Sequence, residues 1–580
     1  MIGLNRHTLS FVLLSLVLWT ATDVSPTRRA FAQAPDVIYT GGTILSCDAE
    51  MSVHQALAVR NGRVLALGDE QTIKALADDS TQSVALGGRT ITPGLIDSHL
   101  HFVGLGASLQ RLDLRDAQSW AEVIAAVEAA ARLLPSGTWI EGRGWHQSKW
   151  NEPPADAIDG YPHHADMSKA VPDHPVLLTH ASGHASFANQ LAMKLAGITG
   201  QTSDPAGGEI LRDANGQPTG VFRENAQQLV RRAQQALNRM ELEDARRLLK
   251  EQVRLAGAEC LRFGITAAHD AGTSIAGARA LKQLADEGEL PVRLAVMIRA
   301  PSHQLEAASE AGMLPRLAHK PGATIAIRSI KLSLDGALGP HGAWLLEPYR
   351  DLPESRGLNT ATVDELERLA RWCRREGWQL CVHAIGDRAN REVLDAYESV
   401  LGDDVNSDHR WRVEHAQHLA KADIPRFGQL GVIPAMQANH CTSDAIFVPA
   451  RLGDRRSAEG AYVWRSLIDS GAIIPNGTDA PVERVDPRVS LYAAVTRQIG
   501  PELQFYPDQC MSRKEALLSY TLWPAIAGFQ EEDLGSLEAG KLADLVIWDT
   551  NLLTCAPEEI LTATVETVWM EGDEVFQNEP

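Results

Sequence analysis

Strand-like and helical segments alternate through the middle of the chain, and this alternation constrains the fold more than any other feature. Helical patterns occur, for example, at 362–377 and 461–471. Parallel strands that alternate with helices are typical of α/β folds, and eight strands close a (β/α)8 barrel. The eight predicted strands are 95–102, 264–272, 292–300, 327–338, 378–387, 410–418, 432–440 and 472–481.

Both ends of the chain differ from the middle. Short alternating segments separated by Gly, Asn and Asp lie before residue 95 and again after residue 534, which predicts strands and hairpins. We therefore expect an α/β protein with a (β/α)8 TIM-like barrel at 95–534 and a small composite β-sandwich domain formed from 35–94 and 535–580. The stretch at about 140–225 is rich in Gly, Pro, Trp and His. It fits badly into one βα unit, and we expect an insertion over the active-site face.

The first 34 residues predict a secretory signal peptide. Arg6 and His7 precede an apolar run at 9–21, and a polar stretch then leads to AFAQA, which predicts cleavage after Ala34. The apolar run is shorter than an ordinary membrane span of about 20 residues. We expect an exported protein, periplasmic or secreted, with no stable membrane span after cleavage. An uncleaved anchor is the alternative.

The composition narrows the choice of partners. The chain of 580 residues has a net charge of −20 and a hydrophobic content of 44%, which is typical of a soluble globular protein and disfavours nucleic-acid binding. Its seven cysteines form no CxxC pair, so the sequence predicts neither a zinc ribbon nor a redox pair. A small-molecule substrate is the expected partner, and a homo-oligomer is compatible with the sequence.

Residues that can bind a metal ion recur at the ends of the predicted strands. Active sites of such barrels form at the carboxyl ends of the strands, and imidazole and carboxylate groups suit zinc and its neighbours. A lone histidine at such a position is more often structural than a ligand, but the recurrence favours a metal site. His99 and His101, spaced i and i+2, project to the same side of one strand. The candidate ligands are His99, His101, Lys331, His383, His415 and Asp479.

Several of these residues lie in motifs that resemble a known family. TPGLIDSHLHF is similar to the metal-binding opening of the amidohydrolase superfamily. With KLSLDGALG, CVHAIGDRAN, RVEHAQH and NGTDAPV it resembles amidohydrolase family 3, whose members include N-substituted formamide deformylases. The resemblance implies a divalent metal, expected to be zinc, as one or two ions. It also implies that Lys331 is carboxylated and bridges two ions, since carboxylation turns a buried cation into an anionic two-oxygen ligand.

The resemblance also implies a reaction. A metal-activated hydroxide would attack the carbonyl carbon of an amide, N-acyl, N-formyl or cyclic amide compound. Asp479 would accept a proton and pass it to the leaving amine. If Lys331 is unmodified, it remains an ammonium paired with Asp335 or with a substrate carboxylate, and a mononuclear site would run the same chemistry.

Four further residues are expected to contact the substrate: His440, His184, Glu224 and His341. His440 follows the seventh strand, His184 and Glu224 lie in segments that resemble the family's insertion, and His341 follows the glycine-rich corner after Lys331. Two other functions stay open. One is hydrolysis of an ester, carbamate or phosphoester on the same metal centre, and the other is a non-catalytic exported protein that binds metal or ligand. Asp479 favours an enzyme, because a pure binding site needs no proton shuttle.

Overall fold

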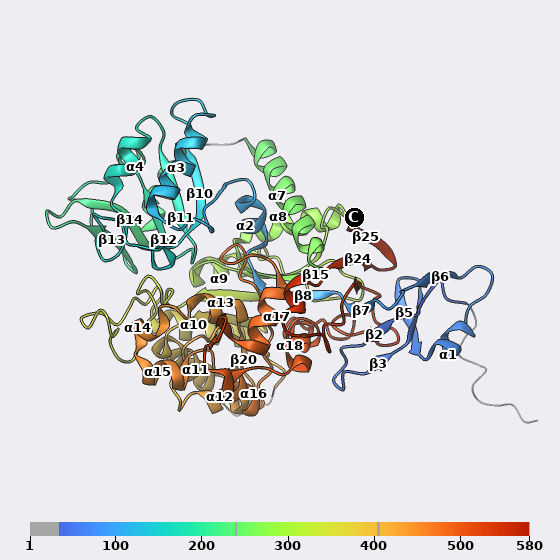
Figure 1. The fold of residues 1–580 in the computed structure, drawn as a ribbon. Coiled ribbons are helices and arrows are strands. Elements are labelled where there is room, and N and C mark those ends of the chain that lie inside the picture. The colour runs from blue at the N-terminus through green and yellow to red at the C-terminus, as the bar shows by residue number, and fades with distance from the viewer. Residues whose placement is uncertain (1–33, 238–240, 403–406, 579–580) are drawn as a thin grey trace, which may run out of the picture.

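The computed structural model of the chain describes residues 34–237, 241–402 and 407–578 (Figure 1). The predicted signal peptide therefore lies outside the described residues, except for Ala34. Within the described ranges, no helix combines the length and the apolar character that crossing a bilayer requires.

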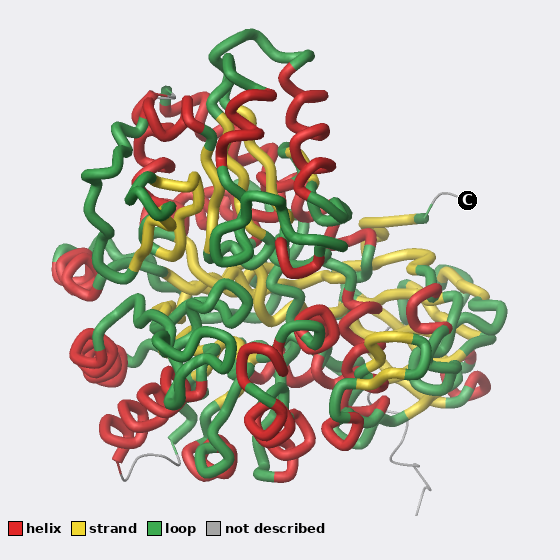
Figure 2. The backbone as a smooth tube through the Cα atoms, turned by 60° about the vertical axis from the view of Figure 1, so that its left-hand side comes forward, coloured by secondary structure: helices red, strands yellow, loops and turns green. Residues whose placement is uncertain are grey.

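A parallel sheet at the centre of the molecule confirms the predicted barrel. Its strands neighbour one another in chain order, from β8 to β20, and helices surround them (Figure 2). Seven of the eight predicted strands are present. They are β8 (Leu95–Leu100), β15 (Ile265–Thr273), β16 (Arg293–Ile298), β17 (Ile325–Ser333), β18 (Gln379–Ala384), β19 (Arg412–His415) and β20 (Ile433–Ala435).

The eighth position of the barrel is filled by an irregular segment and not by a regular strand. At 472–481 a single parallel bridge, between Asn476 and Met436, links this segment to the end of β20. On the other side, Ser98 N donates to Asn476 O at 3.0 Å and Asp479 N donates to His99 O at 2.7 Å. Prolines at 475 and 481 lack the N–H that a regular ladder needs. The barrel is thus closed by a seam, 474–480, whose backbone bonds to both neighbouring strands without forming a regular ladder.

Capping residues mark where the helices of the barrel begin and end, as in α10 (Val363–Glu376). The side chain of Thr362 accepts from Glu365 N at the start, and Gly377 ends the helix in the left-handed conformation. The predicted helix at 461–471 is shorter than expected, as α16 (Trp464–Asp469). Further helices around the barrel are α7 (Leu242–Arg262), α8 (Ile275–Asp286), α9 (Ser302–Glu310), α11 (Asp387–Leu401), α12 (Ile424–Leu430), α13 (Ala438–Asp444) and α17 (Pro487–Thr496).

A second sheet is inserted between β8 and β15 and lies above the barrel in Figure 1. We call it the insertion sheet. Its strand order is β13-β14-β12-β11-β10-β9. The chain fastens it to the mouth of the barrel, because Arg143 Nε donates to Pro481 O at 2.9 Å and Arg223 Nη1 donates to Pro340 O at 3.1 Å. Its elements are β9 (Leu112–Asp113), β10 (Ile140–Trp145), β11 (Val176–His180), β12 (Ala185–Ala188), β13 (Gly208–Arg212), β14 (Pro218–Glu224), α3 (Trp120–Ala131), α4 (His164–Ala170), α5 (Gln190–Leu195) and α6 (Gln227–Leu237).

Two sheets at the right of Figure 1 combine both ends of the chain. One has the order β5-β4-β1-β6, and the other, β25-β24-β23-β7-β2-β3, interleaves strands from the beginning and the end of the chain. They share an apolar core that includes Tyr39, Val59 and Ile547. The strands are β1 (Val37–Thr40), β2 (Thr43–Leu45), β3 (Val53–His54), β4 (Ala56–Arg60), β5 (Arg63–Gly68), β6 (Gln82–Ala85), β7 (Thr90–Pro93), β23 (Leu545–Trp548), β24 (Val565–Met570) and β25 (Asp573–Gln577).

Candidate metal centre

The predicted ligands meet at the mouth of the barrel, because parallel strands bring their carboxyl ends to one face. They come from β8 and the residue after it (His99, His101), β17 (Lys331), β18 (His383), β19 (His415) and the closing seam (Asp479). His415 and Asp479 have φ angles of 76° and 55°. Such backbone conformations are costly for residues other than glycine and cluster at functional sites.

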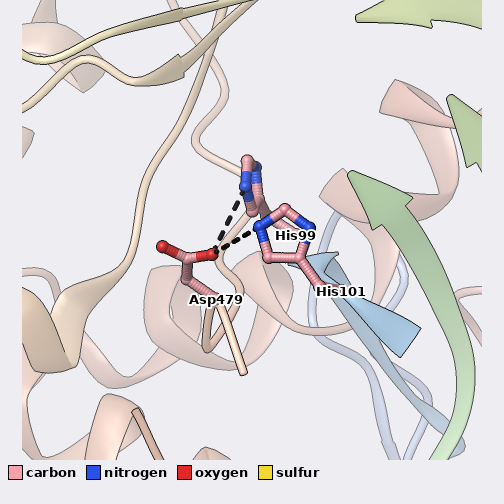
Figure 3. A group of neighbouring side chains, drawn as sticks. All are labelled: His99, His101 and Asp479. Carbon is pink, nitrogen blue, oxygen red and sulfur yellow. Dashed lines mark ion pairs between the residues drawn. The ribbon is translucent and has the colours of Figure 1, made fainter. Parts of the chain in front are cut away.

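His99, His101 and Asp479 form one group of potential ligands (Figure 3). The Oδ1 atom of Asp479 lies 3.3 Å from His101 Nε2 and 3.7 Å from His99 Nε2. Both imidazoles turn their Nε2 atoms toward the carboxylate (Figure 3). One donor atom from each of the three residues lies within 4.8 Å of the others, as ligands of a single ion require.

A second group shares Asp479 and adds His415 and His440. His440 Nε2 lies 3.9 Å from the other carboxylate oxygen, Oδ2. His383 packs beside this group, with its ring centroid 4.5 Å from that of His415. The His99 ring is 4.6 Å from His415. His99, His383, His415, Asp479 and His440 are therefore one continuous cluster, and His440 lies closer to the candidate ligands than the sequence alone indicates.

The donor atoms of this cluster fit a divalent metal ion. His99 Nε2, His383 Nε2, His440 Nε2 and Asp479 Oδ1 are buried and have no hydrogen-bond partner among the described residues. A buried polar atom without a partner is costly. On His415, Nδ1 contacts Gln437 Oε1 at 2.7 Å, and since an amide oxygen only accepts, the proton lies on Nδ1 and Nε2 keeps its lone pair. Unpaired imidazole nitrogens and a carboxylate oxygen are the ligand set that zinc prefers.

Burial keeps the imidazoles in the neutral form that a metal ligand needs. It lowers the pKa of His99 and His383 well below 6.5, and the pKa of His415 to about 3. Burial alone would raise the pKa of Asp479. The nearby imidazole of His101, together with those of His99 and His415, outweighs burial and holds the pKa of this carboxyl well below its usual value.

Lys331 lies in the same cluster but makes few contacts of its own. Its side chain is 3% exposed, and Nζ donates to Ala271 O at 3.3 Å. Burial lowers its pKa to about 8. Among the described residues, no carboxylate lies within ion-pair distance of Nζ, so the pairing with Asp335, the alternative for an unmodified Lys331, does not occur. Asp335 instead accepts from the amides of Ile385, Gly386 and Trp344.

A buried ion-pair network under His99 is a functional feature that the sequence reasoning missed. Glu414 Oε2 contacts His99 Nδ1, and Glu414 Oε1 lies 2.7 Å from Arg412 Nε. Arg412 also donates to Ser98 O at 2.8 Å and contacts His269 Nδ1 at 2.9 Å. A carboxylate on the far nitrogen of a ligand imidazole fixes its tautomer and orientation. The available signal was the alternation of Arg412 and Glu414 in a strand predicted to be buried.

Two cavities meet at the cluster. The larger, of about 450 Å³, includes His101, Lys331, His184 and Glu224 in its wall. The smaller, of about 50 Å³, extends past His440 toward apolar side chains such as Phe447. The residues common to both walls are Ser182, His184, His383, His415, Asp479 and Val482. A substrate held at the cluster would thus reach two chemically different spaces.

The structure brings three of the four predicted substrate contacts to these cavities. His184 Nδ1 lies 2.7 Å from Glu224 Oε2, and the His184 ring is 5.1 Å from His383. His440 lines the smaller cavity, where Gln417 contacts its Nδ1 at 2.9 Å. His341 lies elsewhere. It contacts Asp351 at 3.2 Å and lines a separate cavity with Arg223 and Arg451.

Known proteins resemble this chain over most of its length. The model of a family described as "Amidohydrolase family" matches residues 82–576. Protein LONG AFTER FAR-RED 3 of Arabidopsis thaliana is 32% identical over 557 residues, which cover 93% of this chain and 91% of that protein. N-substituted formamide deformylase of Arthrobacter pascens is 27% identical over 546 residues, covering 93% and 98%.

A solved structure is similar as well. The crystal structure of an uncharacterized metal-dependent hydrolase from Pyrococcus horikoshii OT3 matches with a TM-score of 0.71 and 27% sequence identity. The match covers 90% of this chain and 99% of that chain. Barrel, insertion sheet and composite sheets thus all lie within the span of the similarity.

Proposed function

The chain belongs to the amidohydrolase family, and from this premise we propose that it hydrolyses a carbon–nitrogen bond in an amide, N-acyl, N-formyl or cyclic amide compound. The observation that carries the proposal is the convergence of His99, His101 and Asp479, whose potential ligand atoms lie within 4.8 Å of one another at the mouth of the barrel. The similarity to an N-substituted formamide deformylase supports an N-acyl substrate over an ester.

We propose that His99, His101 and Asp479 hold one divalent ion, expected to be zinc, and that His383 and His415 hold a second. Such an ion, when bound, acidifies a water molecule and polarises a carbonyl group. Glu414 and Gln437 hold the imidazoles of His99 and His415 in the tautomers that leave Nε2 free. These buried partners fix the ligand geometry before substrate arrives.

Asp479 is the proposed proton carrier. Its Oδ1 faces His99 and His101, whereas Oδ2 points toward His440. Oδ2 accepts the proton that the attacking water gives up and returns it to the leaving nitrogen, which makes Asp479 general base and then general acid. His440 and His184 lie where they can donate to the carbonyl oxygen or to the substrate body.

We propose further that Lys331 is carboxylated. In that reaction the neutral amine forms an N–C bond with carbon dioxide and releases one proton to water. Two observations support the change: the side chain is buried, and among described residues no carboxylate pairs with it. A buried ammonium without a counter-charge is unfavourable, whereas a carbamate would give the two proposed ions a shared anionic ligand.

Metal removal and reconstitution test the proposed function. The mature protein is stripped with a chelator and reloaded with zinc, manganese or no metal. It is then assayed on N-substituted formamides, acetamides, cyclic amides and matched esters. We expect hydrolysis of at least one amide class, dependent on metal. Preferential ester hydrolysis, or metal binding with no turnover of any class, would contradict the proposal.

Export and domain boundaries remain proposals drawn from the sequence. We propose that cleavage follows Ala34, that 35–94 and 535–580 form the sandwich domain, and that the barrel domain spans 95–534 with its insertion. Mass spectrometry of the N-terminus of protein recovered outside the cytoplasm tests the cleavage site. Limited proteolysis tests the boundaries, because linkers are cut before packed domains.

A further inference from the structure

The larger cavity has a wall that is rich in arginine. Four arginines line it: Arg111, Arg143, Arg231 and Arg299. They come from different parts of the chain. Arg143 lies in β10 and Arg231 in α6 of the insertion, Arg299 follows barrel strand β16, and Arg111 precedes β9. We call these four residues the arginine wall.

None of the acidic residues that line the same cavity forms an ion pair with the arginine wall. Glu224 is paired with His184 at 2.7 Å, Asp335 accepts from three backbone amides, and Asp479 belongs to the metal cluster. Arg111 does have a carboxylate partner, Glu141, at 2.9 Å. The other three guanidinium groups form no ion pair with any carboxylate in the described part of the chain.

Arg299 is the member of the arginine wall that approaches Lys331. A Cβ placed on Gly272 would lie 3.4 Å from both Arg299 Cδ and Lys331 Cγ, so these two side chains converge over one backbone position. Arg299 is exposed to the cavity. Among the described residues its guanidinium has no hydrogen bond, although the backbone N donates to Thr273 O at 2.7 Å. The N–H donors of Arg299 therefore have no acceptor among the described residues, and the side chain lines the cavity beside the candidate metal cluster.

Arg143 and Arg231 are only partly satisfied. Arg143 donates to Pro481 O at 2.9 Å and Ala181 O at 3.1 Å, and Arg231 donates to Thr179 Oγ1 at 3.1 Å. All of these acceptors are neutral. Burial lowers the pKa of Arg143 to about 10 and also lowers the pKa of Arg231. Cations that burial disfavours gain most from an anion placed among them.

We propose that the arginine wall binds an oxyanion carried by the substrate, a carboxylate or a phosphate-type group, while the scissile amide lies at the metal cluster. This inference rests on the proposed hydrolase function and specifies its substrate class: N-acyl compounds with a terminal acid group. Guanidinium groups bind both kinds of oxyanion through paired hydrogen bonds. A cavity of about 450 Å³ is in the range that small-molecule sites occupy.

The test uses a homologous series in which the distance from amide to acid varies. Its members are N-formylglycine, N-formyl-β-alanine and N-formyl-γ-aminobutyrate, each compared with its own primary carboxamide. N-formylaminomethylphosphonate, compared with its dimethyl ester, separates a phosphate-type preference from a carboxylate preference. Two readouts are taken on the zinc-loaded protein: kcat/KM for hydrolysis, and Kd by calorimetry on the Asp479→Asn variant, which does not depend on turnover.

We expect one acid to exceed its neutral counterpart by about tenfold or more in both readouts, since a hydrogen bond to a charged group contributes roughly 1.5–3 kcal/mol. Arg299→Gln should reduce the acid-to-neutral ratio by about tenfold, and Arg299→Lys by less. Arg132→Gln, at the exposed end of α3, is the matched control and should keep the ratio.

The possible outcomes distinguish a failure of the arginine-wall inference from a failure of the proposed hydrolase function. Hydrolysis in which the neutral compounds equal the acids at every length overturns the arginine wall and leaves the hydrolase intact. An acid preference that Arg299→Gln does not change also overturns it. If the acids bind preferentially but nothing is hydrolysed, the wall stands and the proposed function fails. If nothing is hydrolysed and no acid is bound, both are wrong.

Discussion

The two sides of the larger cavity are built differently. On the barrel side, two of the groups proposed to do the chemistry have buried partners: Glu414 on His99 and Gln437 on His415. On the insertion side, Arg143 and Arg231 contact neutral acceptors and face open space. Groups locked by packing and hydrogen bonds can hold a metal geometry. Groups with unused donors can recognise a ligand. The contrast assigns the chemistry to the barrel, and selectivity to the insertion together with Arg299 at the end of barrel strand β16.

The largest predicted effect comes from removing the proton carrier on the barrel side. Asp479→Asn removes an anionic ligand and the general base together, so kcat should fall at least about 100-fold. Activity is measured on whichever amide the wild type hydrolyses, with circular dichroism to verify folding. Asp508→Asn, at an exposed position, is the control. A variant that keeps activity would remove Asp479 from its assigned role.

The next effect concerns the partner beneath His99. Glu414→Gln keeps the shape of the side chain but removes the charge that orients the imidazole, so metal affinity should weaken by about 10–100-fold. Competition with a chromogenic chelator measures affinity without reference to activity. Glu367→Gln, a partly exposed helix position paired with Arg371, controls for charge loss. Unchanged affinity would mean that Glu414 serves the stability of the barrel alone.

The next prediction concerns a pH-dependent contact on the insertion side, between His184 and Glu224. Burial alone would lower the pKa of His184, but the charge and hydrogen bond of Glu224 outweigh burial and raise it above 6.5. The contact therefore stabilises the folded protein fully below pH 6.5, and the gain is lost as the pH rises through the higher pKa of the folded state. Glu224→Gln should lower the free energy of unfolding by about 1–3 kcal/mol at low pH and by less at high pH.

Thermal unfolding of metal-free wild type and variant, followed from pH 5 to 9, measures this difference. A gap between the two proteins that stays constant with pH would show that Glu224 acts through packing and not through the charge of His184. The same series on Glu209→Gln, whose partner Arg223 does not titrate in this range, supplies a control from the insertion sheet.

The smallest effect is expected at His341. It contacts Asp351 and lines a cavity separate from both spaces at the metal cluster. His341→Ala should change kcat/KM by no more than about twofold, as substitutions away from a site usually do. A loss of tenfold or more would extend the active site to that cavity and restore the role that the sequence suggested.

The candidate metal cluster was predictable because its signal is local. Each candidate ligand lies near the end of a predicted strand, and counting the predicted strands is enough to bring their ends together. The partner of His99 was not predictable in that way, since Glu414 is 315 positions away in the sequence. Its contact depends on the barrel radius and on which side of β19 faces inward.

The irregular closing seam and the arginine wall could not be predicted for a related reason: both depend on tertiary contacts. Residues 472–481 are apolar enough to predict a strand, yet Pro475 and Pro481 prevent a regular ladder, and tertiary closure overrides the pattern. Arg299 and Arg231 look like ordinary surface charges in the sequence. Only the docking of the insertion sheet on the barrel turns both of them toward one cavity.

The interleaved sheet that joins both chain ends has a consequence for biosynthesis. Strand β7, which leads directly into the first barrel strand, pairs with β23 near the C-terminus. A growing chain therefore carries β7 with an open edge until almost the last residues have been made. Open edges recruit other strands, so nascent or truncated chains are vulnerable to mispairing. Release of the C-terminal segment is the event that ends this vulnerability.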